Sequence, residues 1–150
     1  MFSLTPGLAS SLAPGRRPRT TLSPSLALRD GEPYMAFGTP GGDQQDQWSL
    51  QFFLNVVDFG MDLQEALDAP TVQSTHFPGS FYPHQSVPGG VRVESRIPPE
   101  VRDELIARGH KVSVDGPWSH GQVTAVARER NGVLSGAASP RGRVAYIMGR

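Results

Sequence analysis

The sequence predicts an α+β protein in which helices pack on an antiparallel or mixed sheet. Two hairpin signals, Asp30-Gly31 and Asn131-Gly132, each lie between segments whose residues alternate like strands. Between these signals, residues 43–59 carry apolar side chains at helical spacing. Because strands joined by tight turns pair antiparallel, this order disfavours a repeated strand–helix–strand series with a parallel sheet.

The first hairpin joins predicted strands over Leu22–Arg29 and Pro33–Gly38, because Gly31 tolerates the positive φ of a tight turn. A helix is predicted over Asp43–Phe59, and Gly60 is a natural stop for it. The apolar residues of this helix form three neighbouring rows. That surface is too wide for an ordinary surface helix, so we expect the helix to be largely buried.

The rest of the chain alternates short helices and strands. A capping-box pattern from Asp62 to Glu65 begins a short helix that ends before Pro70. The pair Pro98-Pro99 opens a third helix, which Gly109 ends. The remaining predicted elements are a loop, Phe77–Gly90, and the strands Thr71–His76, Val91–Ser95, Lys111–Val114, Gln122–Arg128, Val133–Ala137 and, at the edge of a sheet, Ala145–Met148.

The composition excludes several classes of partner. The 150 residues carry a formal net charge of zero, and the only lysine, Lys111, stands among scattered arginines, so we expect no nucleic-acid partner. No apolar run reaches the roughly 18 residues of a membrane span, so we expect no membrane partner. Cysteine is absent, and the compartment is left open. Residues 1–19, rich in Pro, Gly and Ser, read as an extended lead-in, and residues 20–150 as the folded domain.

The adjacent glycines Gly41 and Gly42 stand where a strand turns into the long helix. A helix start carries unpaired N–H groups and partial positive charge, and glycines let a substrate approach that backbone closely. In acyl transfer this arrangement stabilises a tetrahedral oxyanion. A plain turn between strand and helix is the alternative; the pattern is neither a Walker phosphate loop nor GxGxxG.

Two adjacent hydroxyls, Thr20 and Thr21, precede the first strand. Both hydroxyls of such a pair are able to donate to a carboxylate, especially where the chain bends before Pro24. The alternative is the ordinary preference of threonine for the entry of a strand.

No histidine pair has the spacing of metal ligands, so we expect no metal or other cofactor. Surface or packing roles are predicted for the four histidines, His76, His84, His110 and His120, although the sequence around His84 is compatible with a place in a pocket.

Arg141 and Arg143 lie in a turn, where a structural bridge to an Asp is favoured over a substrate clamp.

Four stretches together resemble the C-terminal half of the small subunit of gamma-glutamyltranspeptidases, over nearly the whole chain. They are "RPRTTLSPSLALRDGEPYMAFGTPGGDQQ", "LNVVDFGMDLQEALDAP", "RGHKV" and "GAASPRG". The resemblance implies an N-terminal nucleophile hydrolase fold, an αββα sandwich of which this chain forms part. It also implies that a threonine, exposed by self-cleavage of a precursor, attacks a gamma-glutamyl amide such as glutathione and forms an acyl-enzyme. Water, an amino acid or a peptide then takes the acyl group.

The resemblance implies catalytic or substrate-binding roles for four residues of this sequence. Gly41 and Gly42 match the glycine pair of the family's oxyanion hole. Thr20 and Thr21 stand where the family has a serine pair that binds the substrate carboxylate, and their added methyl groups narrow the pocket. The implied ligand is therefore a gamma-glutamyl or related amide.

The family's nucleophile has no match in this sequence, since neither Thr5 nor Thr20 stands in its context. The upstream part of the same precursor, with the large subunit and the nucleophile, is thus the expected partner. We expect the isolated chain to be inactive and to expose apolar faces. Two other hypotheses stay open: part of a cephalosporin-acylase-like amide hydrolase, and a noncatalytic module that binds a small anion at Gly41-Gly42.

Overall fold

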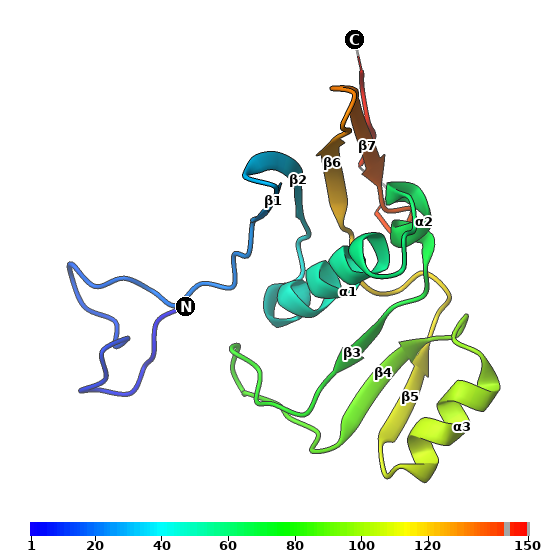
Figure 1. The fold of residues 1–150 in the computed structure, drawn as a ribbon. Helices are drawn as coiled ribbons and strands as arrows, with labels where there is room; N and C mark the ends of the chain where they lie inside the picture. The colour runs from blue at the N-terminus through cyan, green and yellow to red at the C-terminus, as the bar shows by residue number, and fades with distance from the viewer. Residues whose placement is uncertain (143–144, 150) are drawn as a thin grey trace.

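The computed structural model describes residues 1–142 and 145–149 (Figure 1). A four-stranded sheet, a three-stranded sheet and three α-helices make up the fold. In chain order the elements are β1 (Ser25–Arg29), β2 (Glu32–Gly38), the 3-10 turn η1 (Gly42–Gln44), α1 (Gln45–Val57), α2 (Leu63–Asp68), β3 (Val72–Ser74), β4 (Gly90–Glu94), α3 (Pro99–Ala107), β5 (Lys111–Asp115), β6 (Thr124–Arg128) and β7 (Leu134–Ala138).

The first sheet has the strand order β1-β2-β6-β7 and is antiparallel throughout. Its hairpin turn at Asp30-Gly31 is as predicted, with φ of 54° and 85°, the left-handed values that a tight turn between twisted strands requires. The central register pairs Met35 with Ala127. The two predicted hairpins therefore supply β1-β2 and β6-β7, and the sheet is closed by a pairing of β2 with β6 that is distant in sequence.

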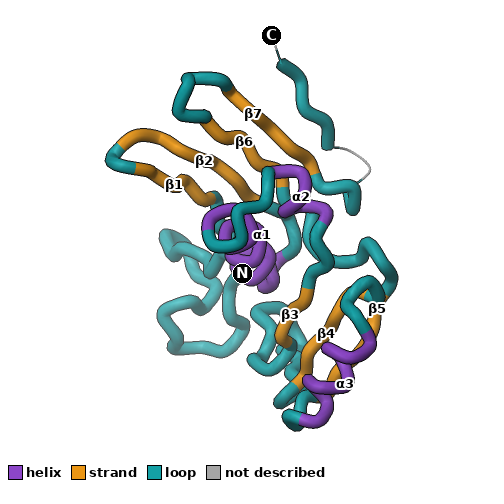
Figure 2. Tube along the Cα trace, turned by 45° about the vertical axis from the view of Figure 1, so that its right-hand side comes forward, coloured by secondary structure: helices purple, strands orange, loops and turns teal. Residues whose placement is uncertain are grey.

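One face of this sheet packs against α1 and α2 and forms the core. Met35 from β2, Ala125 from β6 and Phe52 from α1 are all buried there. The Phe37 ring meets the Phe52 ring at a centroid distance of 5.3 Å. Figure 2 shows α1 and α2 lying together beside this sheet.

Helix α1 is less buried than its sequence predicts. Its fully buried residues are Gln45, Ser49 and Phe52, whereas Leu50 is 56% exposed. Within the described residues, the broad apolar surface of α1 is therefore covered on one side only, where it packs on the first sheet. The prediction of a largely buried helix is wrong for this chain taken alone.

The second sheet, in the order β3-β4-β5, is mixed. Strands β3 and β4 are antiparallel, but β4 and β5 run parallel because α3 connects them as a crossover. The second sheet is therefore the mixed form of the predicted antiparallel or mixed sheet. A hairpin signal marks antiparallel neighbours, while a helix between two strands allows either direction.

The other face of the first sheet is apolar and open. Leu26, Ala36, Val126 and Gly136 pair across the four strands and so share this face. Leu26 is 69% and Val126 54% exposed. We call these four residues the open sheet face.

The predicted edge strand Ala145–Met148 is wrong, since residues 145–149 form no strand. A Cβ placed on Gly136 would lie 3.0 Å from Ile147 Cγ2. Because Gly136 belongs to the open sheet face, Ile147 lies against that face, and the segment does not pair along the edge of β7.

Residues 1–19 form no helix or strand, and their one ladder contact is an isolated bridge between Ser3 and Ser11. In Figure 1 this segment loops out beside the sheets. The domain boundary after residue 19 stays a prediction. In the described part of the chain no helix has the length and apolar character to cross a membrane.

Candidate active site

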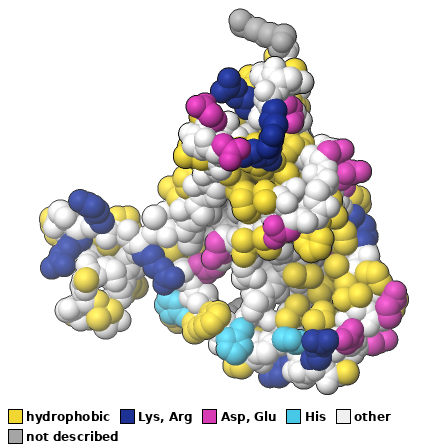
Figure 3. Space-filling view, viewed as in Figure 1, with side chains coloured by type: hydrophobic (Ala, Val, Ile, Leu, Met, Phe, Trp, Pro, Cys, Tyr) yellow, Lys and Arg dark blue, Asp and Glu magenta, His cyan; other side chains and the backbone are white. Residues whose placement is uncertain are grey.

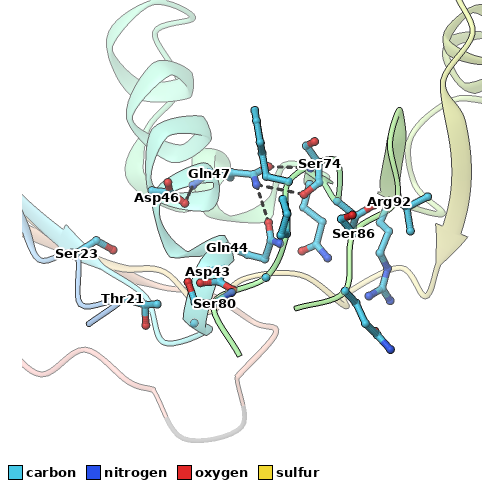
Figure 4. A pocket seen from close by; sticks show the side chains of 18 of the residues that line it. Thr21, Ser23, Asp43, Gln44, Asp46, Gln47, Ser74, Ser80, Ser86 and Arg92 are labelled. Atoms are coloured by element: carbon cyan, nitrogen blue, oxygen red, sulfur yellow. Dashed lines mark hydrogen bonds between the residues drawn. The ribbon is translucent and has the colours of Figure 1, made fainter. Parts of the chain in front are cut away.

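A cavity of about 1030 Å³ lies between the start of α1, the segment before β1 and the second sheet. Thr20, Thr21 and Gly42 all line it, whereas Gly41 does not. Figure 4 shows Thr21, Asp43 and Ser80 close together at one side of this cavity and Arg92 at the other. The structure thus brings together three of the four residues that the sequence nominates.

The glycine pair has a backbone that only glycine adopts easily. Gly41 has φ 138° and Gly42 has φ 65°. A Cβ on Gly41 would overlap the ring of Trp48, and one on Gly42 would lie 3.0 Å from Phe81 Cε2. Both glycines are therefore required by conformation and by close approach.

The N–H groups of Gly41 and Gly42 donate no hydrogen bond among residues 1–142 and 145–149. Gly42 begins the 3-10 turn η1, which leads into α1, and the N–H of Gln45, the first residue of α1, donates to the Gly42 carbonyl. Free N–H groups in a turn before a helix suit an anion.

The two threonines have different surroundings. Thr20 Oγ1 accepts a hydrogen bond from the Leu22 N–H at 3.1 Å. Thr21 Oγ1 accepts from Gln45 Nε2 at 3.4 Å, which links the segment before β1 to the start of α1. Neither hydroxyl donates a hydrogen bond to another described residue, so each is able to donate to a ligand.

Asp43, the first residue of the predicted helix, lines the cavity. Its Oδ2 accepts from the Ser80 N–H at 2.6 Å, so it fastens the loop after β3 to the turn that follows Gly42. Burial raises the pKa of Asp43, but hydrogen bonds from Ser80 and the charges of Arg19 and His84 outweigh that effect and lower it. The carboxylate is therefore ionised at neutral pH.

Trp48 connects the glycine turn to a buried histidine. Its ring lies against Gly41 and Gly121 and stacks on His120 at a centroid distance of 6.4 Å. His120 Nε2 in turn is 2.7 Å from Asp115 Oδ2. The predicted packing role of His120 is confirmed.

The other histidines lie outside the cavity lining. His76 and His84 are exposed, and each bonds to the backbone of its own loop region; His84 does not line the pocket that its sequence suggested. His110 follows the end of α3, where its N–H donates to Leu105. Within the described ranges no group of three or more His, Asp and Glu side chains is placed to hold a metal ion.

Glu94 is fully buried and is the centre of an ion cluster. Arg141 donates to both of its carboxylate oxygens at 2.7 Å, and Arg96 donates at 2.9 Å. Burial raises the pKa of Glu94, but the Arg141 hydrogen bonds and charge, with backbone N–H donors from His120 and Thr71, lower it to about 2. A structural ion pair for Arg141 is confirmed, with Glu94 rather than an Asp as its partner. Arg143 lies outside the described residues.

Comparison with known proteins places this geometry in a family. The gamma-glutamyltranspeptidase family model matches residues 1–148. The acylase ACY 1 proenzyme of Pseudomonas sp. (strain SE83) is 40% identical over 91% of this chain and 22% of its own length. The glutathione hydrolase proenzyme of Escherichia coli (strain K12) is 30% identical over 94% of this chain and 22% of its own. The chain thus spans about a fifth of the length of these relatives.

Solved structures agree in fold. The structure titled LmbA2991HD superposes with a TM-score of 0.90 at 58% identity, covering 100% of this chain and 27% of that one. Gamma-glutamyltranspeptidase from Pseudomonas nitroreducens, complexed with L-DON, gives a TM-score of 0.76 at 29% identity over 99% of this chain and 78% of that one. Cephalosporin acylase from Bacillus halodurans gives 0.78 at 34% identity over 99% and 26%.

These neighbours confirm the predicted α+β, N-terminal nucleophile hydrolase class of fold. The match also covers both regions that form the cavity wall, the glycine turn and the second sheet. This chain belongs to the gamma-glutamyltranspeptidase family.

Proposed function

We propose that this chain is the C-terminal part of the small subunit of a gamma-glutamyltransferase-like enzyme. The enzyme cleaves gamma-glutamyl amides, glutathione among them, through an acyl-enzyme on a threonine and transfers the acyl group to water, an amino acid or a peptide. In this proposal Gly41 and Gly42 form the oxyanion hole, and Thr20 and Thr21 bind the substrate.

One observation carries the proposal: the adjacent N–H groups of Gly41 and Gly42 have no acceptor among the described residues, and Gly42 lines a cavity that Thr20 and Thr21 also line. An N–H that faces the developing oxyanion stabilises the transition state by roughly 3–4 kcal/mol. The hydroxyls supply donors for a carboxylate in the same cavity. Family membership supplies the reaction type for which such an arrangement is suited.

The nucleophile belongs to another part of a longer precursor in this proposal. The relatives named above are proenzymes, and this chain spans 22% of each. The open sheet face supports a partner segment as well, because Leu26 and Val126 are largely exposed among the described residues.

The test is hydrolysis of a chromogenic gamma-glutamyl anilide by the complete, self-processed precursor and by the isolated chain. We expect turnover by the precursor and none by the chain. Thr21→Val in the precursor should raise KM about tenfold, because one hydrogen bond to a charged carboxylate is lost. Thr5→Val, in the lead-in, is the matched control. Turnover by the isolated chain, or an unchanged KM in Thr21→Val, contradicts the assignment.

A cephalosporin-acylase-like hydrolase is the second candidate. The acylase relative is 40% identical and the glutathione hydrolase 30%, which favours a different acyl group. A glutaryl anilide lacks only the α-amine of the gamma-glutamyl anilide. A higher kcat/KM on the glutaryl compound would favour the acylase over the gamma-glutamyltransferase.

A further inference from the structure

The second sheet forms one wall of the cavity, and the side chains of this wall are a cross-strand row of polar residues. Gln73 of β3 pairs with Arg92 of β4, and Arg92 pairs with Ser113 of β5. Paired residues share a face of a sheet, and all three line the cavity. Lys111, two residues before Ser113, lies on the same face and also lines the cavity.

Gln73 is the residue that points to a ligand. It is only 6% exposed, and its Oε1 is buried without a hydrogen-bond partner among the residues the structure describes. Its Nε2 donates no hydrogen bond there either. A buried amide oxygen without a hydrogen-bond donor costs free energy unless a ligand pairs with it.

The positive charge at this wall is held in place. Arg92 donates to Asp115 twice, from Nε and from Nη2, each at 2.8 Å, and His120 Nε2 lies 2.7 Å from Asp115 Oδ2. The remaining guanidinium nitrogen, Nη1, donates to no described residue. No carboxylate of residues 1–142 or 145–149 lies within 4 Å of the Lys111 ammonium.

We propose that Gln73, Arg92, Lys111 and Ser113 form a subsite for the leaving group of the amide substrate, which is a peptide-type amine with a terminal carboxylate. Lys111, Arg92 Nη1 and the Ser113 hydroxyl bind the carboxylate, and the Gln73 amide pairs with the peptide group beside it. This subsite rests on the proposed function, since the same cavity joins it to Gly42 and Thr21.

The experiment uses the complete, self-processed precursor and two gamma-glutamyl donor substrates that differ in one chemical group. One is glutathione, and the other is its C-terminal amide, which has the same gamma-glutamyl bond and no terminal charge. We expect Lys111→Gln to raise KM for glutathione about tenfold, because a charge-assisted contact is lost. The KM for the amide and kcat for both donors should not change.

Two variants keep the test specific. Lys111→Arg retains the charge and should keep the wild-type preference for glutathione. Arg108→Gln, on α3 at a side chain paired with Glu104 and outside the cavity lining, should leave both KM values unchanged. A Ser113→Ala variant provides a second, smaller loss of glutathione affinity should Lys111→Gln fold poorly.

The outcomes separate the two proposals. If both donors are cleaved with equal KM and Lys111→Gln alters neither, the subsite is wrong while the proposed function stands. If the processed precursor cleaves neither donor, the proposed function fails and the subsite fails with it. Loss of the glutathione preference in Lys111→Gln alone supports the subsite.

Discussion

At the scale of single residues, Gly41 has little freedom to change. Its φ of 138° is unfavourable for any side chain, and Trp48 occupies the space that a Cβ would need. Trp48 is itself held between Gly121 and His120. The direction of the Gly41 and Gly42 N–H groups is therefore set by packing and not by hydrogen bonds.

We predict that Gly41→Ala lowers kcat of the complete enzyme about a hundredfold, because displacement of a catalytic group by about 1 Å costs that much. Gly38→Ala is the matched control: Gly38 lies three residues earlier, with open space around its Cβ position. Steady-state kinetics on the gamma-glutamyl anilide measures both. Equal activity of the two variants would show that the turn tolerates a side chain.

At the scale of elements, the loop between β3 and β4 depends on one carboxylate for its place beside the cavity. Asp43 accepts the Ser80 N–H, while bonds from Gly79 to Gln85 and from Val87 to Thr75 close the loop on itself. Residues at both ends of this loop line the cavity. Loss of Asp43 therefore alters a wall of the site without touching the glycine pair.

We predict that Asp43→Ala destabilises this loop by about 1–3 kcal/mol, since the buried Ser80 N–H loses its acceptor. Amide hydrogen exchange over residues 77–87 should become faster by a corresponding factor. Asp46→Ala is the control, because among the described residues the Asp46 carboxylate accepts only from the neighbouring Gln47 N–H. Unchanged exchange in Asp43→Ala would rule out the anchoring role.

At the scale of the whole molecule, the Glu94 cluster joins the two sheets. Glu94 ends β4 of the second sheet, and Arg141 follows β7 of the first. Arg141 also donates to the carbonyls of Leu67 and Ala69 at the end of α2. Figure 3, which colours side chains by type, shows acidic and basic side chains spread over the visible face. The Glu94 cluster, in contrast, is buried.

We predict a loss of stability in acid from Glu94. Its pKa in the folded protein is about 2, below the ordinary value of 4.5. The stabilisation, about 3 kcal/mol, is therefore complete above pH 4.5 and is lost as the pH falls toward 2. Denaturant unfolding of the complete protein between pH 7 and pH 2 measures it.

The matched variants for this prediction are Glu94→Gln and Glu104→Gln. The first should remove this part of the pH dependence and cost about 3–5 kcal/mol at pH 7, because Arg141 is left buried without its partner. The second breaks an exposed pair on α3 and should cost less than about 1 kcal/mol. A pH dependence that persists in Glu94→Gln would assign the acid loss to other groups.

The open sheet face makes the isolated chain prone to association. Leu26 and Val126 present apolar surface that the complete protein covers in our proposal. We predict that the isolated chain elutes as oligomers in size-exclusion chromatography and that Leu26→Gln with Val126→Thr shifts it toward monomer. Leu4→Gln, in the lead-in, should have no effect. A monomeric wild-type chain with a cooperative thermal transition contradicts the prediction.

Local sequence signals were sufficient for much of the secondary structure. Asp30-Gly31 determined a turn because few residues other than glycine accept its φ, and the Asp62 capping box started α2 where both of its hydrogen bonds form. The glycine pair and the threonine pair were also visible, since adjacent residues of one kind stand out in a sequence. The burial of α1 and the final strand were predicted wrongly, because both depend on what lies opposite.

Tertiary structure alone decided which distant residues meet. Nothing local relates Gln73, Arg92 and Ser113, yet strand register aligns them in one row along the cavity. Glu94 and Arg141 are likewise joined only by the packing of two sheets. The physical reason is that turns, caps and periodicity are short-range interactions, whereas register, crossover direction and ion pairing are set by long-range contacts between chain segments.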